Sequence, residues 1–197
     1  MACNMKKSRI TGKTLIVANV IFTVALLCNS SYADHPSDLE TKIKAAYLYN
    51  FLRFVEWPED IELINNICVY GIEEKHHSAF NSMATISKKN QKIKVDLFNG
   101  NEEIEKLSSC QIIFITDKAK NKSKAVIEYL NKIKDNHILT VGESNEFINN
   151  GGMINFIRIK DKIRFEINQH AATAAGLKIS SQVLRIAERV ISKDEQS

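Results

Sequence analysis

Four polar side chains lie on segments whose other residues are mainly apolar, which makes them candidates for site chemistry. Arg53 is near the apolar face of a predicted helix, and Glu166 is inside a predicted strand. Lys178 and Ser180 alternate with apolar residues in an extended segment and therefore point the same way. An acid, two bases and a hydroxyl beside the core could line a pocket for a small polar ligand. The alternative is a structural ion pair of Glu166 with Lys178 or Arg53.

Sequence motifs for common catalytic chemistry are missing from the chain. There is no glycine-rich phosphate loop, no dinucleotide-binding glycine pattern, no Gly-x-Ser-x-Gly elbow and no Cys-x-x-Cys. The neighbours His76 and His77 point to different sides of a helix or strand, and no third metal ligand accompanies them. His170 is predicted to be a capping or surface residue rather than a catalytic base. We therefore predict no catalytic residues, no metal site and no cofactor.

The first 33 residues have the three-part pattern of a secretory signal peptide. A basic stretch, Lys6–Lys13, precedes an apolar run, Thr14–Cys28, and Ser31-Tyr32-Ala33 places small residues where signal peptidase reads them. This run has about 15 residues, whereas a membrane span needs about 20, so a retained anchor is the weaker alternative. The bulky Leu27 disfavours a lipid anchor on the cysteine after it. We expect cleavage after Ala33, which leaves 34–197 as one exported domain.

The charge of the chain is unevenly distributed. The net charge is +4, but residues 1–33 hold four basic residues and no acid, so the remainder is neutral. The lysine-rich run Lys118–Lys124 contains no aromatic residue and is predicted to be a solvated turn and helix start. We therefore predict no nucleic-acid partner. A length of 197 residues, with 44% hydrophobic and 25% charged residues, suits one globular domain.

The pattern of apolar residues predicts an α/β order of elements. A helix is predicted to begin near Ser37, with Glu40 completing a capping box, and to end at Trp57-Pro58. Three continuous apolar runs predict strands buried on both faces, and an alternating run predicts a strand nearer an edge. The buried runs are 67–72, 112–116 and 138–141, the edge run is 92–98, and a helix is predicted over 123–134.

The last third of the chain predicts a hairpin followed by two short helices. With Lys160-Asp161 as the turn, Phe156 faces Phe165, Ile154 faces Ile167, and Asn155 faces Glu166 on the other side of the sheet. Helices are predicted over 171–175 and 181–191, separated by Gly176. The expected fold is a single α/β domain with a mixed, mostly parallel sheet, helices on both faces and a C-terminal antiparallel hairpin.

Six segments, in the same order, resemble the YfiR family of exported periplasmic regulators. They are KAAYLYNFLRFVEWP (Lys44–Pro58), ICVYG (Ile67–Gly71), ILTVGES (Ile138–Ser144), GGMINFI (Gly151–Ile157), KIRFEIN (Lys162–Asn168) and AAGLKISSQVLRIA (Ala174–Ala187). The resemblance implies a non-enzymatic, dimeric repressor that binds the periplasmic domain of an inner-membrane diguanylate cyclase and limits cyclic-diguanylate signalling and biofilm formation. An outer-membrane OmpA-like lipoprotein is implied as a second partner.

The resemblance also assigns roles to individual residues. Cys68 and Cys110 match a cysteine pair of the family, whereas Asn155 stands at one position of a second pair that some members carry. Glu166, Lys178 and Ser180 match positions that line a small-molecule site in some members. A small-ligand sensory module for another membrane receptor is the alternative function, and an exported enzyme is the weakest.

The cysteine count leads independently to the same pair. Once Cys3 and Cys28 leave with the signal peptide, Cys68 and Cys110 remain, and an exported chain permits a disulfide between them. They lie at matching ends of the first and third strands, which are expected to be parallel neighbours about 4.8 Å apart. Disulfides join Cα atoms about 4.4–6.8 Å apart, so we predict a structural bridge. The alternative is two buried thiols.

Overall fold

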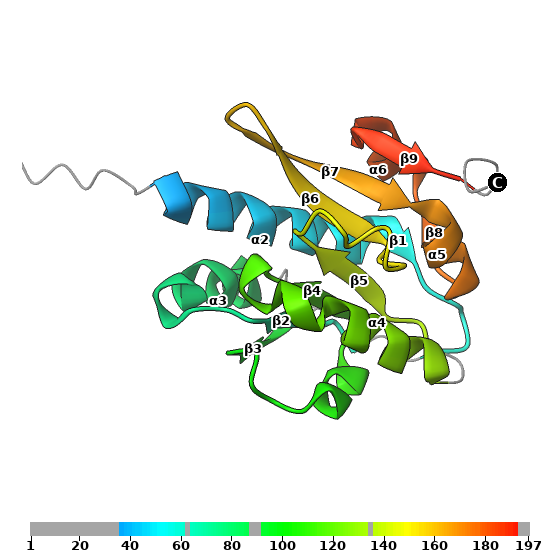
Figure 1. Ribbon diagram of the computed structural model, residues 1–197, viewed down its shortest axis with the longest axis horizontal. Coiled ribbons are helices and arrows are strands. Elements are labelled where there is room, and N and C mark those ends of the chain that lie inside the picture. The colour runs from blue at the N-terminus through cyan, green and yellow to red at the C-terminus, as the bar shows by residue number, and fades with distance from the viewer. Residues whose placement is uncertain (1–35, 62–63, 87–91, 134–135, 193–197) are drawn as a thin grey trace, which may run out of the picture. The chain divides into compact units, whose positions relative to one another are not determined.

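A seven-stranded sheet organises the residues that the computed structural model describes, which are 36–61, 64–86, 92–133 and 136–192 (Figure 1). They belong to one compact unit, His35–Ser197. The predicted signal peptide lies outside these residues. In spatial order the strands are β3 (Lys94–Phe98), β2 (Asn66–Tyr70), β4 (Ile112–Ile115), β5 (Leu139–Gly142), β6 (Ile154–Ile159), β7 (Lys162–Asn168) and β9 (Arg189–Ile191).

The helices and a second, two-stranded sheet complete the fold. The α-helices are α2 (Pro36–Phe54), α3 (His77–Ile86), α4 (Ser123–Lys132), α5 (Gln169–Ala174) and α6 (Ser181–Ile186). Three 3₁₀ segments are η1 (Glu74–His76), η2 (Ile104–Ser109) and η3 (Asp117–Lys122), and the small antiparallel sheet pairs β1 (Val55–Glu56) with β8 (Lys178–Ile179). Within the described ranges, no helix is both long and apolar enough to cross a membrane.

The strand directions confirm the predicted mixed, mostly parallel sheet. β3, β2, β4, β5 and β6 run parallel, β7 is antiparallel to β6, and β9 is parallel to β7. β2 lies between β3 and β4. From β2 the chain moves to β3 on one side, and after β3 it crosses back to β4 on the other side of β2. This reversal makes a topological switch point between β2 and β4, and open α/β sheets bind ligands at the carboxyl ends of the strands there.

Both faces of the sheet are covered by helices, as predicted. Alternate residues of β2 show the division, because Ile67 and Val69 join one apolar cluster while Cys68 and Tyr70 join another. The first cluster includes buried residues of α2, α3, α5 and α6, and the second includes residues of η2, η3 and α4. Because both sides of the strands are buried, their sequences are continuously apolar rather than alternating.

α2 is fixed by an aromatic cluster on its sheet-facing side. Tyr47 and Phe51, one helical turn apart, both contact Phe165, with ring centroids 5.2 and 5.4 Å away. The helix ends at Phe54 rather than at the predicted Trp57, because Val55 pairs in extended conformation with Ile179 of β8. The side chain of the predicted capping residue, Ser37, lies outside the described part.

The hairpin of β6 and β7 has the predicted register. Ile154 pairs with Ile167, Asn155 with Glu166 and Phe156 with Phe165. Lys160 at the turn adopts a φ of +55°, which allows the unfavoured Lys-Asp pair to reverse the chain.

Two parts of the structure differ from the sequence predictions, one at the C-terminus and one between β2 and β3. The predicted helix 181–191 is wrong in its second half: α6 ends at Ile186, and residues 189–191 form β9 because they hydrogen-bond to the outer edge of β7. The helix α3 was not predicted, although Phe80 and Met83 on its inner side are almost completely buried against the sheet.

Candidate functional site

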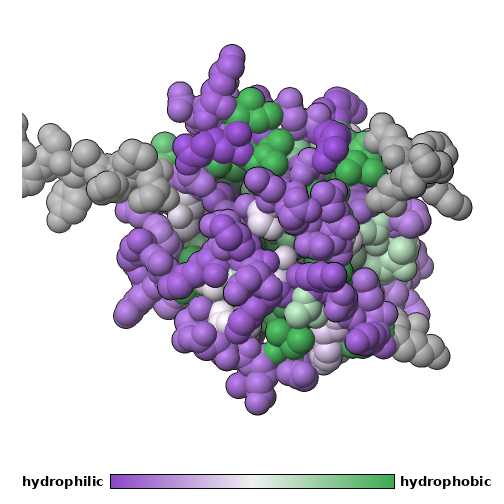
Figure 2. Space-filling view, viewed as in Figure 1, coloured by the Kyte–Doolittle hydropathy of each residue, from purple (hydrophilic) through white to green (hydrophobic). Residues whose placement is uncertain are grey.

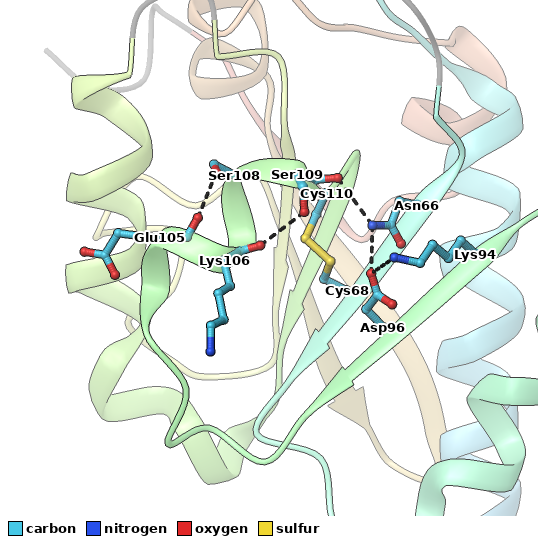
Figure 3. The surroundings of a disulfide bond; sticks show 9 residues. All are labelled: Asn66, Cys68, Lys94, Asp96, Glu105, Lys106, Ser108, Ser109 and Cys110. Carbon is cyan, nitrogen blue, oxygen red and sulfur yellow. Dashed lines mark hydrogen bonds and ion pairs between the residues drawn. A yellow bond between two sulfur atoms is a disulfide. The ribbon is translucent and has the colours of Figure 1, made fainter.

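A disulfide joins Cys68 of β2 to Cys110, which follows η2 (Figure 3). The two Cα atoms are 5.8 Å apart and both residues are buried, so the predicted pairing is present. The bridge lies toward the amino ends of β2 and β4. It ties η2 onto the sheet, away from the carboxyl ends of the strands.

Polar contacts fasten the same end of β2 to its neighbours (Figure 3). The amide of Asn66 donates to the Asp96 carboxylate at 3.0 Å and to the Ser109 carbonyl at 3.3 Å, and Lys94 contacts Asp96 at 2.7 Å. Burial raises the pKa of Asp96, but the hydrogen bonds from Lys94 and Asn66 outweigh burial and leave the pKa below its usual value. The polar groups at this end of the sheet therefore have a structural role, because they bond to one another and to the neighbouring strand and η2.

The four residues singled out in the sequence have separate partners. Arg53 lies over the rings of Tyr49 and Phe54, and exposed Lys178 contacts Glu56 at 2.9 Å. The Ser180 hydroxyl accepts the Val183 N–H at the start of α6. That these residues bind a ligand together stays a prediction.

Glu166 has a structural partner that the sequence did not suggest. Its carboxylate accepts two hydrogen bonds from Arg189 of β9, at 2.7 and 3.1 Å, and one from Asn155 of β6 at 3.2 Å. The ion pair is therefore with Arg189 rather than with Lys178 or Arg53. Because Arg189 was expected on a helix, sequence spacing could not bring it beside Glu166.

Replacing Arg189 with Gln should lower the free energy of unfolding by about 1–3 kcal/mol, because the Glu166 side chain, only 12% exposed, would lose its charged partner. The matched change Lys178→Gln breaks a pair whose side chains are 76% and 62% exposed, so it should cost less than about 1 kcal/mol. Urea unfolding of both variants measures the difference. Equal losses would show that the Glu166–Arg189 pair has no special structural role.

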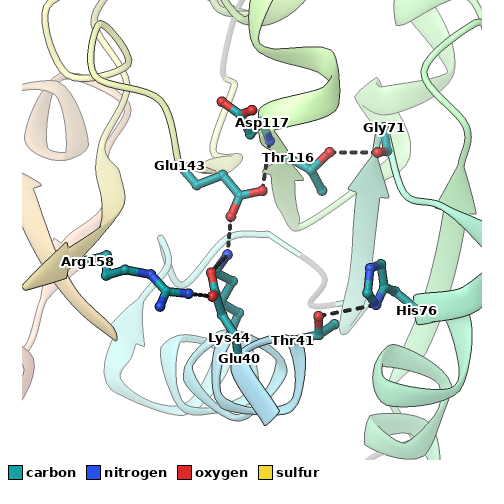
Figure 4. Close-up of polar contacts among 9 residues, drawn as sticks. All are labelled: Glu40, Thr41, Lys44, Gly71, His76, Thr116, Asp117, Glu143 and Arg158. Atoms are coloured by element: carbon teal, nitrogen blue, oxygen red, sulfur yellow. Dashed lines mark hydrogen bonds and ion pairs between the residues drawn. The ribbon is translucent and has the colours of Figure 1, made fainter. Parts of the chain in front are cut away.

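The carboxyl ends of β2, β4 and β5 border a cleft at the switch point, which we call the switch-point cleft. It has a cavity volume of about 250 Å³ and is bounded by α2, η1, α3, the segments after β2 and β4, and Glu143 after β5. Its floor is apolar and consists of Ile72, Phe80 and Phe114, each no more than 5% exposed. Gly71 and Thr116 close its upper end, where the Thr116 hydroxyl donates to the Gly71 carbonyl at 2.6 Å (Figure 4).

A chain of alternating charges runs along one side of the switch-point cleft, and three of its members, Glu40, Lys44 and Glu143, line the cleft (Figure 4). Arg158 pairs with Glu40, Glu40 pairs with Lys44 at 2.6 Å, and Lys44 pairs with Glu143. Glu143 also accepts the backbone N–H of Asp117 at 2.7 Å. The side chains of Lys44 and Glu143 are each 14% exposed, so this end of the network is largely shielded from water, whereas Arg158 at the other end is 59% exposed.

The opposite wall carries a second charged group around η1. Glu73 contacts Lys75 at 2.7 Å and Lys118 at 3.4 Å, and these hydrogen bonds hold the pKa of Glu73 below its usual value. The Nδ1 atom of His76 lies 3.4 Å from the Thr41 hydroxyl (Figure 4). Among the described residues, no cluster of three or more His, Cys, Asp or Glu side chains could hold a metal ion.

Sequence reasoning missed this cleft because its residues come from four separate stretches of the chain, 40–44, 71–80, 114–118 and 143. Lys44, His76 and Glu143 lie on different elements and form no local motif. The cleft could have been predicted from the strand topology alone. Gly71 and Thr116 each follow a buried strand, and residues that follow neighbouring parallel strands meet at the same edge of the sheet.

The family model described as YfiR/HmsC-like matches residues 41–188. No curated protein gives a significant match to the chain.

Two solved structures share the fold at low identity. One is a conserved domain protein from Vibrio cholerae, with 12% identity, a TM-score of 0.51 and 77% of this chain covered. The other is an ABC domain from Streptococcus pneumoniae, solved in complex with L-Trp, with 11% identity, a TM-score of 0.52 and 75% of this chain covered. The chain spans 60% of the length of each structure. At these identities the likeness shows the fold alone.

Proposed function

Because this chain belongs to the YfiR/HmsC-like family, we propose that it is a periplasmic regulator of diguanylate cyclase signalling. The observation that carries the proposal is the match of the family model over 41–188, which includes the strands β2 to β7 and the C-terminal segments as far as Glu188. In this proposal the protein acts by binding another protein and not by catalysis.

The proposed partners are a membrane-bound cyclase and an outer-membrane lipoprotein. The regulator represses an inner-membrane diguanylate cyclase by binding its periplasmic domain, and so limits cyclic-diguanylate signalling and biofilm formation. An OmpA-like lipoprotein of the outer membrane removes the regulator from the cyclase, and the regulator acts as a homodimer. Residues 1–33 direct export and are cleaved after Ala33, and the Cys68–Cys110 disulfide suits an oxidising compartment.

The surface of the described residues supports reversible binding. Figure 2 shows that hydrophilic side chains cover most of one face and that apolar residues form separate small groups. Over the described residues, the exposed large hydrophobic side chains are Leu39, Ile64, Ile159 and Ile186. Interfaces that form and dissociate are about as apolar as ordinary protein surface, so a surface of this kind suits a regulator that exchanges partners.

Deleting the gene should raise intracellular cyclic diguanylate and surface attachment, because the cyclase would lose its repressor. Complementation with the full chain should restore both, whereas a chain lacking 1–33 should not, since it would stay in the cytoplasm. Unchanged cyclic diguanylate in a strain that normally produces the protein would contradict the proposal. Equal rescue by the chain without 1–33 would contradict its periplasmic site of action.

The second candidate function is a sensory module that binds a small ligand for another membrane receptor. The switch-point cleft favours it, because a polar-rimmed hollow at this position of an α/β sheet is a common ligand site. Affinity purification of the exported protein with its membrane partners separates the two functions, because one retains a cyclase and the other a different receptor.

A further inference from the structure

We propose that the free end of the β6–β7 hairpin binds the surface of an anionic phospholipid bilayer. This end consists of residues 157–164, and we call it the hairpin arm. Such binding is a property of this chain alone and does not depend on cyclase regulation.

The hairpin arm extends past the strands on either side of it. β5 pairs with β6 only as far as Asn155, and β9 contacts β7 no nearer to the turn than Phe165, whose carbonyl accepts the Glu188 N–H. The four residues of β6 that follow Asn155 reach about 13 Å past the end of β5, at about 3.3 Å per residue. Figure 1 shows the turn of this hairpin projecting at the edge of the molecule.

The hairpin arm has one packed face and one open face. The packed face lies toward α2, where Ile163 joins the apolar cluster. The open face carries two pairs of residues across the strands, Ile157 with Arg164 and Ile159 with Lys162. The pair nearer the turn is exposed and the other pair is half-buried. Each pair joins an apolar side chain to a cation, so the open face is amphipathic.

Most of the positive charge on the hairpin arm has no counter-charge. Lys160 in the turn, Lys162 and Arg164 form no ion pair with any residue that the structure describes. The fourth cation, Arg158, pairs with a carboxylate of α2. The acid of the arm is Asp161, so three unpaired cations against one acid leave a net charge of +2.

The wider charge distribution of the domain has the same sense. Residues 158–191 hold seven basic and three acidic residues, whereas the rest of the domain from Asp34 onward holds 16 basic and 20 acidic residues. Besides the acid in the turn, the acids of the basic stretch are Glu166, which pairs with Arg189, and Glu188. A domain that is neutral as a whole therefore has a positive C-terminal part, from which the arm projects.

A bilayer surface matches this arm better than a protein surface does. Anionic headgroups attract each Lys or Arg that comes near them, and apolar side chains enter the boundary between headgroups and acyl chains. Long basic side chains keep their charges among the headgroups while the isoleucines lie deeper. Protein interfaces are depleted in lysine and bury about 800 Å² on each partner, which is more than two pairs of side chains on a narrow arm provide.

Co-sedimentation with phospholipid vesicles tests the proposal, using protein purified after expression of the full chain. Vesicles that contain phosphatidylglycerol should bind the protein about tenfold or more tightly than vesicles of phosphatidylcholine alone, because only the first kind is anionic. High salt should release the protein, because salt screens charges that are exposed to solvent. Equal binding to both kinds of vesicle, or binding to neither, would overturn the proposal.

Two triple variants that lose the same charge test the location. The arm variant replaces the three unpaired cations by Lys160→Gln, Lys162→Gln and Arg164→Gln. The control variant replaces three lysines that each pair with a carboxylate, by Lys118→Gln, Lys120→Gln and Lys124→Gln. The arm variant should bind the anionic vesicles at least tenfold more weakly than the wild type, at about fivefold per cation, and the control should stay within about twofold. Equal losses in the two variants would overturn the proposal.

A tryptophan near the turn reports insertion directly and keeps the cations in place. Ile159→Trp lies at an exposed position, and its fluorescence should shift to shorter wavelength with the anionic vesicles as the ring leaves water. Trp57 donates to the carbonyl of His137, which precedes β5 at the opposite end of the sheet, so the wild type should show no shift. Vesicle binding of Ile159→Trp without a shift would place the contact elsewhere and overturn the proposal.

An acidic protein surface is the competing partner of the hairpin arm. It would be identified if the folded wild type bound no vesicles but retained a membrane protein that the arm variant lost. That result would overturn the assignment to lipid.

Discussion

Replacing Phe147 with alanine should lower the free energy of unfolding by about 3–5 kcal/mol. The ring is completely buried in the cluster under α4. It lies between Gly142 at the end of β5 and Gly152 before β6, and a side-chain carbon on either glycine would overlap its atoms. The ring therefore fills space that two glycines leave open, and alanine would leave a cavity that the rigid strand ends cannot close.

Urea unfolding measures this loss, and Phe98→Ala provides a control on the half-buried edge strand β3. The control should cost clearly less, because part of the Phe98 side chain already faces water. Gly142→Ala should also destabilise the protein, by about 1–3 kcal/mol, since the added methyl group meets the ring. A loss below about 1 kcal/mol for Phe147→Ala would contradict this account of the packing.

Removing both cysteines of the bridge, by Cys68→Ala with Cys110→Ala, should lower the free energy of unfolding by on the order of 4 kcal/mol. The bridge closes a loop with a sequence separation of 42, and breaking it gives the unfolded chain more conformations. The double change leaves neither cysteine of this pair as a free buried thiol, so its effect measures the loss of the bridge.

Urea unfolding of the double variant and of the wild-type protein, each with and without reductant, isolates the contribution of the bridge. Reductant should lower the stability of the wild type toward that of the variant and leave the variant unchanged. A mass measurement after alkylation of unfolded, unreduced protein from the periplasm provides a direct check. Two alkylated thiols in that sample would show that the bridge does not form in the cell.

The sheet was predictable from sequence because strands buried on both faces need continuous apolar residues. That requirement located β2, β4 and β5, and the pairing of Asn155 with Glu166 followed from the period of two along the hairpin. The segment ending at Ile191 was predicted wrongly because Val190 and Ile191 suit either a helix or a strand. What decides between them is the open edge of β7, which only the folded sheet provides.

The candidate site was less predictable for a related reason. Glu166 was correctly placed on a strand, but its cationic partner, Arg189, comes from the segment whose structure was predicted wrongly. The switch-point cleft depends on α2 lying beside the ends of β2, β4 and β5, so that Lys44 reaches Glu143. That placement results from packing of Phe51 and its aromatic neighbours on the hairpin and leaves no local sequence pattern.

The pairing of β1 with β8 determines when the native core can form. The contact of Lys178 with Glu56 joins residues 122 positions apart in the chain, and α2 packs against both β7 and α6. Contacts between such distant segments require a long loop to close first, which slows folding. During synthesis, α2 can pack on α3 early, but its surfaces on β7 and α6 exist only after the hairpin and the segments after it have been made. The native core of the growing chain is therefore complete only after the C-terminal segments that pair with β1 and pack on α2 have been made.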